Sequence, residues 1–248
     1  QKCRESVFTY EKAWREMSED MAYMADLDNA YITLDNNYIE SCWWILDKVF
    51  KDGLIYEGAK ILPYCPRCGT GLASHEVAQG YKEVKVLTAI CKFKRKAADN
   101  EYYLAWTTTP WTIPANLAIC LNSELTYALV DSEKGKLIVL EELIDSLWTK
   151  FGLEKKEILK TFKGREREMI TCQHPLYDRE SLIILGDHVT ADAGTGCVHT
   201  APGFGADDFF VGQKYGLPAY CNVDEHGCMM EDAGDWLKGQ YVDDANKT

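Results

Sequence analysis

The 248-residue chain lacks any apolar run that approaches the roughly 20 residues a membrane-spanning helix needs. Its first stretch, QKCRESVF, is charged and has no apolar segment of the kind that signal peptides carry. Ten cysteines are too few for a disulfide scaffold in a chain of this length, and most of them stand singly in apolar runs. We therefore expect a cytoplasmic protein without a membrane partner, in which most cysteines are small buried side chains.

Positive charge is also scarce, because 39 Asp and Glu outweigh 27 Lys and Arg and give a net charge of −12. This excess at first argues against a nucleic-acid partner. Basic residues nevertheless cluster in KFKRK at 92–96 and in KEILKTFKGRER at 156–167. Taken alone, such clusters are typical of solvated loops or sheet edges, and a local surface that contacts phosphates is the alternative.

Apolar spacing divides the chain into a helical beginning and a strand-rich remainder. Residues 4–25 carry an apolar stripe at three- and four-residue steps, which predicts one helix. A second helix is predicted from Asp35 or Asn36, either of which can cap it, to a point just before Gly53.

After Gly53 the sequence changes to short β-rich runs separated by turn residues, which predicts an α+β fold with a compact, β-barrel-like domain over about 80–235. Two further helices are predicted, one over 140–150 and one beginning at the turn PGFGADD. The predicted strands lie at 54–62, 82–93, 101–109, 117–121, 126–130, 136–140, 181–185 and 196–201.

Hydroxyl side chains are concentrated in the stretch WTTTPWTIPAN. If the strand continues through the threonines, Thr107 and Thr109 lie on one face and Thr108 on the other. Pro110 ends the strand or opens it to solvent. Such a run is most often a simple β-branched strand end. Alternatively, the prolines stiffen a loop whose hydroxyls and Asn116 amide orient a polar ligand or a water molecule.

A second polar stretch, DAGTGCVHTAPGFGADDFF, joins a strand to the beginning of a helix. Asp207 and Asp208 fall in the first turn of that helix, where the helix dipole keeps carboxylates ionised. For Asp207 we expect a capping role alone, and a single histidine such as His199 is more often a satisfied core residue. Side by side, however, Asp208 would hold an ammonium group and the flat His199 ring would bound a cavity.

One cysteine pair has metal-ligand spacing, in PYCPRCGT. Zinc normally takes four ligands, whereas Cys65 and Cys68 supply two and His75 is the only imidazole nearby in the sequence. We therefore predict half of a zinc knuckle. A thioredoxin-like redox role is less favoured, because no βαβ unit surrounds the pair.

Together, WTTTPWTIPAN and GTGCVHTAPGFGADD resemble the two active-site motifs of the editing domain of isoleucyl-tRNA synthetases, an insertion in the Rossmann catalytic domain of these class I enzymes. The stretch from NNYIESCWW to EVAQGYK resembles the segment leading into that insertion, so the resemblance covers nearly the whole chain. Valyl and leucyl relatives carry arginine at the position of Thr109, which favours the isoleucyl type; a valyl or leucyl editing domain is the alternative.

The resemblance implies that the chain is a fragment, because the family's ATP-handling signatures HIGH and KMSKS are missing. The second cysteine pair of the knuckle is expected beyond Thr248, so zinc is expected in the full-length enzyme, and editing itself needs no cofactor. Phe204 departs from the histidine that many bacterial members carry. Four parts are implied: a helical lead-in at 1–60, a half zinc-ribbon linker at 61–80, the editing domain at 81–235 and a return segment at 236–248.

The implied activity is hydrolytic proofreading of valyl-tRNA(Ile), and also of valyl-adenylate, with the tRNA acceptor end and the rest of the synthetase as partners. In this scheme Asp208 pairs with the substrate ammonium, and Thr108 and Thr109 position the ester and the attacking water. The rings of Trp111 and His199 line a cavity that admits valine and excludes isoleucine. The implied catalytic residues are Thr107, Thr108, Thr109 and Asp208, and the implied substrate-binding residues are Trp111, Asn116, His199 and Thr200. A non-catalytic module that binds the tRNA end, and a structural spacer, are the alternatives.

Overall fold

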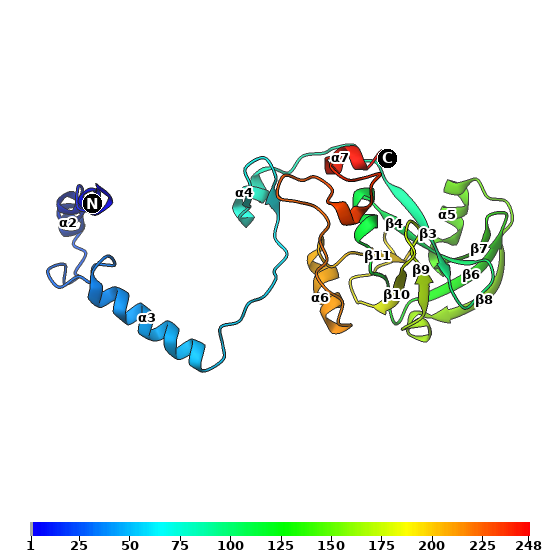
Figure 1. Cartoon of the computed structure of the whole chain (residues 1–248), viewed down its shortest axis with the longest axis horizontal. Coiled ribbons are helices and arrows are strands. Elements are labelled where there is room, and N and C mark those ends of the chain that lie inside the picture. Colours follow the sequence, from blue (N-terminus) through cyan, green and yellow to red (C-terminus); the bar gives the residue numbers. More distant parts are fainter. Residues whose placement is uncertain (1) are drawn as a thin grey trace. The chain divides into compact units, whose positions relative to one another are not determined.

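A computed structural model describes residues 2–248, and the chain divides between Gly58 and Ala59 into two compact units (Figure 1). None of the helices in this range is both long enough and apolar enough to cross a membrane. Each unit is described by itself. The finer division of the second unit at residues 80 and 235 stays a prediction.

The first unit consists of the helices α1 (Lys2–Val7), α2 (Glu11–Asp20) and α3 (Asn36–Lys51). The single helix predicted over 4–25 is wrong, because a turn at 8–10 separates α1 from α2. Two aromatic residues and a threonine occupy that turn, and these residue types have low helix propensity. The second predicted helix is confirmed as α3, with Asp35 at its N-cap and Gly53 just past its end in the left-handed region.

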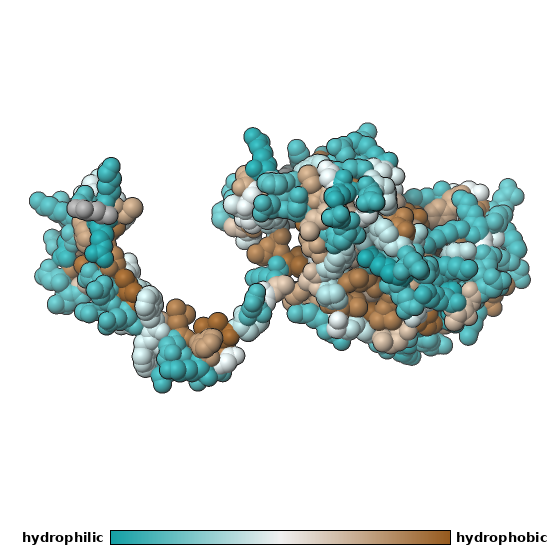
Figure 2. All heavy atoms as spheres, viewed as in Figure 1, coloured by the Kyte–Doolittle hydropathy of each residue, from teal (hydrophilic) through white to brown (hydrophobic). Residues whose placement is uncertain are grey.

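Apolar side chains of the first unit stay largely exposed, since none of its described residues is buried. The space-filling view shows apolar atoms gathered over α3 (Figure 2). Trp43 and Phe50 are 71% and 67% exposed. The apolar stripe that predicts α3 is therefore not covered within its own unit.

The second unit begins with an extended segment and a small hairpin. The strand predicted over 54–62 is wrong, because these residues form no strand. The hairpin pairs β1 (Tyr64–Cys65) with β2 (Thr70–Gly71), and its turn places Gly69 at a φ of 68°. Helix α4 (Ser74–Gln79) follows.

A closed β-barrel forms the centre of the second unit, which confirms the predicted α+β, barrel-like fold (Figure 1). Its strands follow the order β11-β5-β10-β9-β3-β4, and a pairing of β11 with β4 closes the ring. They are β3 (Ala89–Arg95), β4 (Glu101–Thr107), β5 (Ala118–Leu121), β9 (Thr171–Gln173), β10 (Glu180–Leu185) and β11 (Val198–Thr200).

The sheet continues past β4 through three more strands, β7 (Gly135–Leu140), β6 (Thr126–Ser132) and β8 (Glu157–Lys163). Several strands are buried on both faces, which explains their continuous apolar runs. In β4, for example, Tyr103 and Ala105 face the barrel core, whereas Leu104 packs towards α5 (Ile144–Phe151). Strands β8 and β9 were not predicted, because β8 is mostly exposed and charged and β9 has three residues.

The remaining elements cover the barrel. Helix α5 follows the 3-10 turn η2 (Glu141–Leu143), and α6 (Ala206–Lys214) packs Val211 against the outward face of β5 and β10. The others are the 3-10 turns η1 (Pro110–Ala115), η3 (Gly164–Arg167) and η4 (Glu231–Ala233), and helix α7 (Val242–Ala245).

One pairing in the barrel decides where the two polar motifs meet. Strands β4 and β11 run parallel, with Trp106 opposite Val198. Parallel neighbours end at the same edge of a sheet. The threonine run that follows β4 and the turn that follows β11 towards α6 therefore emerge at one end of the barrel.

Candidate functional site

A polar pocket of about 320 Å³ lies at this end of the barrel. Three segments contribute to its lining: the threonine stretch, the loop that leads into β11, and the first turn of α6. The predicted residues that line it are Thr107, Thr108, Thr109, His199 and Asp208. The structure thus brings together the two motifs that stand about 90 residues apart in the chain.

The threonine wall is shaped by its own hydroxyl groups. Strand β4 ends at Thr107, earlier than predicted, and Pro110 begins η1. The Thr107 Oγ1 accepts a hydrogen bond of 3.1 Å from the backbone N–H of Thr109, and the two hydroxyls lie 3.4 Å apart. Thr107 is itself buried, whereas Thr108 and Thr109 are exposed. Thr107 therefore holds the turn, and Thr108 and Thr109 are exposed residues that line the pocket.

The acidic wall consists of Asp208 in the first turn of α6. Its Oδ2 accepts a hydrogen bond of 2.9 Å from the backbone N–H of Ala201, which fixes the carboxylate against the turn after β11. Burial raises the pKa of Asp208, although that hydrogen bond and the nearby His188 ring act in the opposite direction. A partly buried carboxylate of this kind gains most from a cation that enters the pocket.

His199 contributes a neutral ring to the pocket. Burial lowers its pKa to about 3, so the imidazole carries no charge near pH 7. Both of its nitrogens have partners in the protein: Nε2 lies 2.9 Å from Thr112 Oγ1, and Nδ1 lies 2.8 Å from Asn116 Nδ2. The ring therefore bounds the pocket and has no free nitrogen for acid–base chemistry.

Three predicted substrate-binding residues do not line the pocket. Asn116 and Thr200 are fully buried, and Asn116 instead contacts His199 from behind. Trp111 does not line the pocket either: its backbone N–H donates to Asn246 Oδ1 at 3.0 Å, and its ring packs edge-on against Phe204 at a centroid distance of 4.9 Å. Phe204 does line the pocket, so Trp111 supports that wall from outside.

Several residues that line the pocket were not among the predicted site residues. Thr112 lines the pocket, although within the threonine stretch it looks like an ordinary turn residue. His188 also lines it and is an isolated histidine in the sequence GDHVTAD. Gly194 and Gly196 have φ values of 78° and 76°, and a Cβ on Gly196 would lie 2.4 Å from the Leu140 side chain. Paired glycines before β11 are a recognisable sign of a tight, fixed loop.

The residues present do not form a complete metal centre. Cys65 ends β1 and Cys68 lies in the turn of the β1–β2 hairpin, and a hydrogen bond from the Cys68 backbone lowers the pKa of Cys65. Within residues 2–248, however, no three His, Cys, Asp or Glu side chains are grouped to hold a metal ion. The half zinc site stays a prediction, and Cys65 and Cys68 do not line the pocket.

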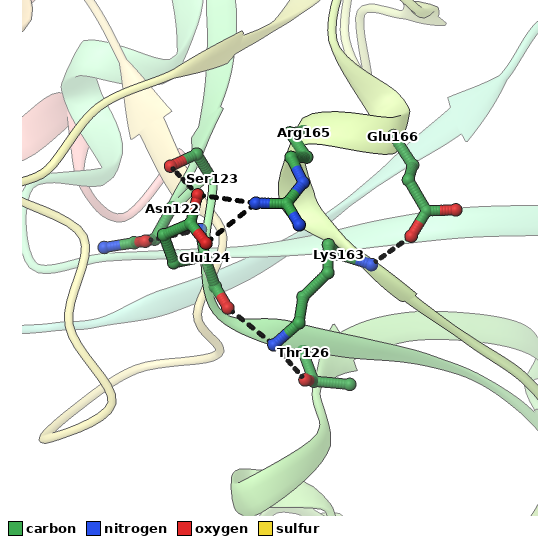
Figure 3. A network of polar contacts seen from close by, with 7 residues as sticks. All are labelled: Asn122, Ser123, Glu124, Thr126, Lys163, Arg165 and Glu166. Carbon is green, nitrogen blue, oxygen red and sulfur yellow. Dashed lines mark hydrogen bonds and ion pairs between the residues drawn. The ribbon is translucent and has the colours of Figure 1, made fainter.

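Each of the two basic clusters includes side chains that pair with carboxylates of the same unit. Figure 3 shows Arg165 bound to both carboxylate oxygens of Glu124, and Lys163 bound to the Glu124 carbonyl and the Thr126 hydroxyl. In the other cluster Lys96 pairs with Glu180 at 2.7 Å. Such pairing favours the interpretation of solvated sheet edges over a free phosphate-binding surface.

Comparison with known proteins places this geometry in a family context. A family model described as class I tRNA synthetases (I, L, M and V) matches residues 1–236. The isoleucine–tRNA ligase of Clostridium tetani is 46% identical over 98% of the chain, and isoleucine–tRNA ligase 2 of Bacillus cereus is 47% identical over 99%. The chain spans 24% of the length of each of these relatives.

The fold has a counterpart of known structure. The editing domain of the cytosolic leucyl-tRNA synthetase of P. knowlesi superposes with a TM-score of 0.53 at 12% identity, over 68% of this chain and 93% of that one. At this identity the match concerns the fold. The barrel therefore has the architecture of a class I editing domain, as the sequence motifs predict.

Proposed function

The chain belongs to the class I tRNA synthetases of the isoleucine, leucine, methionine and valine group, and from this premise we propose that it carries the editing site of an isoleucine–tRNA ligase. The proposed reaction is hydrolysis of valine from valyl-tRNA(Ile), and also of valyl-adenylate. A site that activates isoleucine distinguishes valine poorly, because one missing methylene changes binding by only about 1–3 kcal/mol; isoleucine enzymes are the standard example of this limit. A second, smaller site removes the errors.

A single observation carries this proposal: the exposed residues Thr108 and Thr109 and the acidic residue Asp208 line one pocket. An aminoacyl ester presents a cationic amine, an ester carbonyl and a ribose within a few atoms of one another. Asp208 matches the amine, and the threonine wall matches the ester and ribose oxygens. The phenyl ring of Phe204 and the imidazole of His199 bound the remaining space, where a short branched side chain fits.

The proposed mechanism uses water as the nucleophile. The α-ammonium pairs with Asp208, while the Thr108 and Thr109 hydroxyls hold the ester and orient a water molecule towards its carbonyl carbon. The water oxygen bonds to that carbon and gives up a proton, the bond from the carbon to the ribose oxygen breaks, and the ribose oxygen takes up a proton, so that free valine and the ribose hydroxyl are formed. The ester is already activated, so a serine or cysteine nucleophile is not needed, and the neutral His199 supplies shape rather than proton transfer.

Side-by-side hydrolysis of valyl-tRNA(Ile) and isoleucyl-tRNA(Ile) by this polypeptide tests the proposal. We expect rapid loss of valine and slow loss of isoleucine, because a close-packed wall yields little to one additional methylene. Hydrolysis of both esters at equal rates would contradict the assignment. Retention of charged tRNA in a binding assay, with the ester intact, would instead support the non-catalytic binding module.

A further inference from the structure

Behind the threonine wall lies a line of buried polar side chains that leads away from the pocket into the barrel. It consists of Ser181 on β10, Asn116 after η1, His199 on β11 and Thr112 on η1, and we call it the Ser181 relay. Their exposed fractions are 0%, 0%, 7% and 5%. Buried polar atoms are costly unless each has a partner, so the direction of every hydrogen bond in the relay can be worked out.

The Asn116 amide fixes the first step. Its Nδ2 donates to the Ala118 carbonyl at 2.7 Å, which only an N–H group can do, so the other atom is the oxygen. That oxygen accepts a hydrogen bond of 2.6 Å from the Ser181 hydroxyl. The second N–H of Nδ2 then points at His199 Nδ1, 2.8 Å away. Ser181 and Ala118 together thus hold the amide in one orientation.

The orientation of the amide determines where His199 carries its proton. Because Nδ1 accepts from Asn116, it bears no hydrogen, and the neutral ring must carry its proton on Nε2. The Nε2–H group donates to Thr112 Oγ1 at 2.9 Å. Thr112 in turn donates from Oγ1 to the Thr109 carbonyl at 2.8 Å.

All four hydrogen bonds point the same way, from Ser181 through Asn116, His199 and Thr112 to the backbone of Thr109. Bonds aligned in this manner polarise and strengthen one another. The last acceptor belongs to the residue whose hydroxyl lines the pocket. The Ser181 hydroxyl in the barrel interior is therefore linked by hydrogen bonds to the backbone of Thr109 in the threonine wall.

We propose that Ser181 is a positioning residue for the editing reaction: through Asn116 it fixes the Nε2–H tautomer of His199, and through Thr112 it fixes the placement of the Thr109 hydroxyl. This inference rests on the proposed function for its kinetic consequence, but the tautomer is a property of the folded chain alone. Ser181 does not line the pocket, so it acts only through the other three residues.

Long-range proton–nitrogen NMR of the histidine rings tests the relay in the full chain without any substrate. We expect His199, assigned by the loss of its signals in His199→Gln, to show a proton on Nε2 and none on Nδ1. In Asn116→Asp the carboxylate has no N–H to offer and accepts from Nδ1 instead, so the proton is expected to move to Nδ1. A wild-type ring with its proton on Nδ1 would overturn the relay, as would an Asn116→Asp ring that keeps it on Nε2.

The kinetic test compares Ser181→Ala with a matched control, Ser132→Ala. Ser132 is also a buried strand serine, and it donates to the Gly135 carbonyl at 2.7 Å in a hairpin that does not line the pocket. We expect Ser181→Ala to lower kcat for valyl-tRNA(Ile) about tenfold, with KM changed less than about twofold, since misplacement of a reacting group affects mainly the chemical step.

Ser181→Ala is also expected to mix the two His199 tautomers, and Ser132→Ala to change neither kcat nor the tautomer. Equal kinetic effects of the two variants, or a Ser181→Ala protein with a single Nε2–H tautomer and full kcat, would refute the positioning role. If Ser181→Ala does not fold, Ser181→Cys, which keeps the volume and weakens the donor, takes its place. If the wild type hydrolyses no ester while its His199 shows the expected tautomer, the proposed function fails and the relay stands.

Discussion

The two walls of the pocket are built on opposite principles. The threonine wall is held by a series of neutral hydrogen bonds that reach Ser181 in the barrel. The acidic wall depends on one carboxylate, Asp208, with a single backbone donor at Ala201. The first wall suits the placement of a water molecule and an ester, and the second suits the attraction of a cation. Loss of one residue should therefore affect the acidic wall most severely.

Asp208→Ala should have the largest effect, because it removes the one charge that pairs with the substrate ammonium. We expect transition-state binding to weaken by roughly 2–4 kcal/mol, which is about a 30- to 1,000-fold loss in kcat/KM for valyl-tRNA(Ile). The matched control is Asp207→Ala, which lies in the same turn of α6 but does not line the pocket. Deacylation by Asp208→Ala within two- to threefold of wild type would remove Asp208 from the site.

Lowering the pH should reduce the free energy of unfolding, because two buried histidines near the threonine wall must then take up protons. Burial lowers the pKa of His199 to about 3 and that of His174, which contacts the Ile113 carbonyl of η1, to about 4. A depressed histidine pKa stabilises the fold above the unfolded value of about 6.5 and loses that contribution as the pH falls through the folded value. We expect a loss on the order of 3 kcal/mol for each ring as the pH falls from about 6.5 towards 4.

Denaturant unfolding at a series of pH values measures how much the free energy of unfolding decreases as the pH falls. His199→Gln should reduce the loss of stability in acid, whatever the stability of this variant at pH 7. A stability of the wild type that stays constant between pH 7 and pH 4.5 would show that neither ring is held neutral.

Much of this site follows from the sequence, but its assembly does not. The motif of three threonines and the acidic helix tip are visible in the chain, because hydroxyls before a proline and carboxylates in a first helical turn have local causes. Their meeting depends on the parallel pairing of β4 with β11, at Trp106 and Val198. Such a pairing joins segments far apart in the chain, and local residue patterns carry no information about it.

What the sequence does not show about Trp111 and Ser181 has the same origin. Trp111 stands in the middle of the threonine motif, yet η1 turns its ring away from the pocket, and only the packing against Phe204 reveals this. Ser181 belongs to a plain apolar strand, and its role appears once β10 lies beside β5 and the Asn116 side chain. Side-chain direction in a short 3-10 turn and partners across a barrel are tertiary properties.

Phe204 offers a smaller test of how closed the pocket is. Among residues 2–248 it alone lines both the polar pocket and a neighbouring apolar cavity of about 590 Å³. Phe204→Ala should join the two spaces and admit a larger side chain, so hydrolysis of isoleucyl-tRNA(Ile) relative to the valyl ester should rise about tenfold. Phe210→Ala, on the exposed face of α6, is the control. An unchanged ratio of the two rates would mean that other groups set the size limit.

The smallest expected effect is on stability: Asp208 and the buried histidines should change the free energy of unfolding with pH in opposite directions. Burial raises the pKa of Asp208, so this group favours folding below its unfolded pKa of 3.8 and loses that contribution as the pH rises through the folded value. Asp208→Asn keeps an oxygen for the Ala201 N–H but carries no charge, so the variant should be slightly more stable than wild type at pH 7 and equal to it below pH 3.8. The buried imidazoles have the opposite dependence, because acid charges them. A variant less stable than wild type at pH 7 would mean that the Asp208 carboxylate stabilises the fold without substrate. Burial of the charge would then not explain why Asp208 binds a cation.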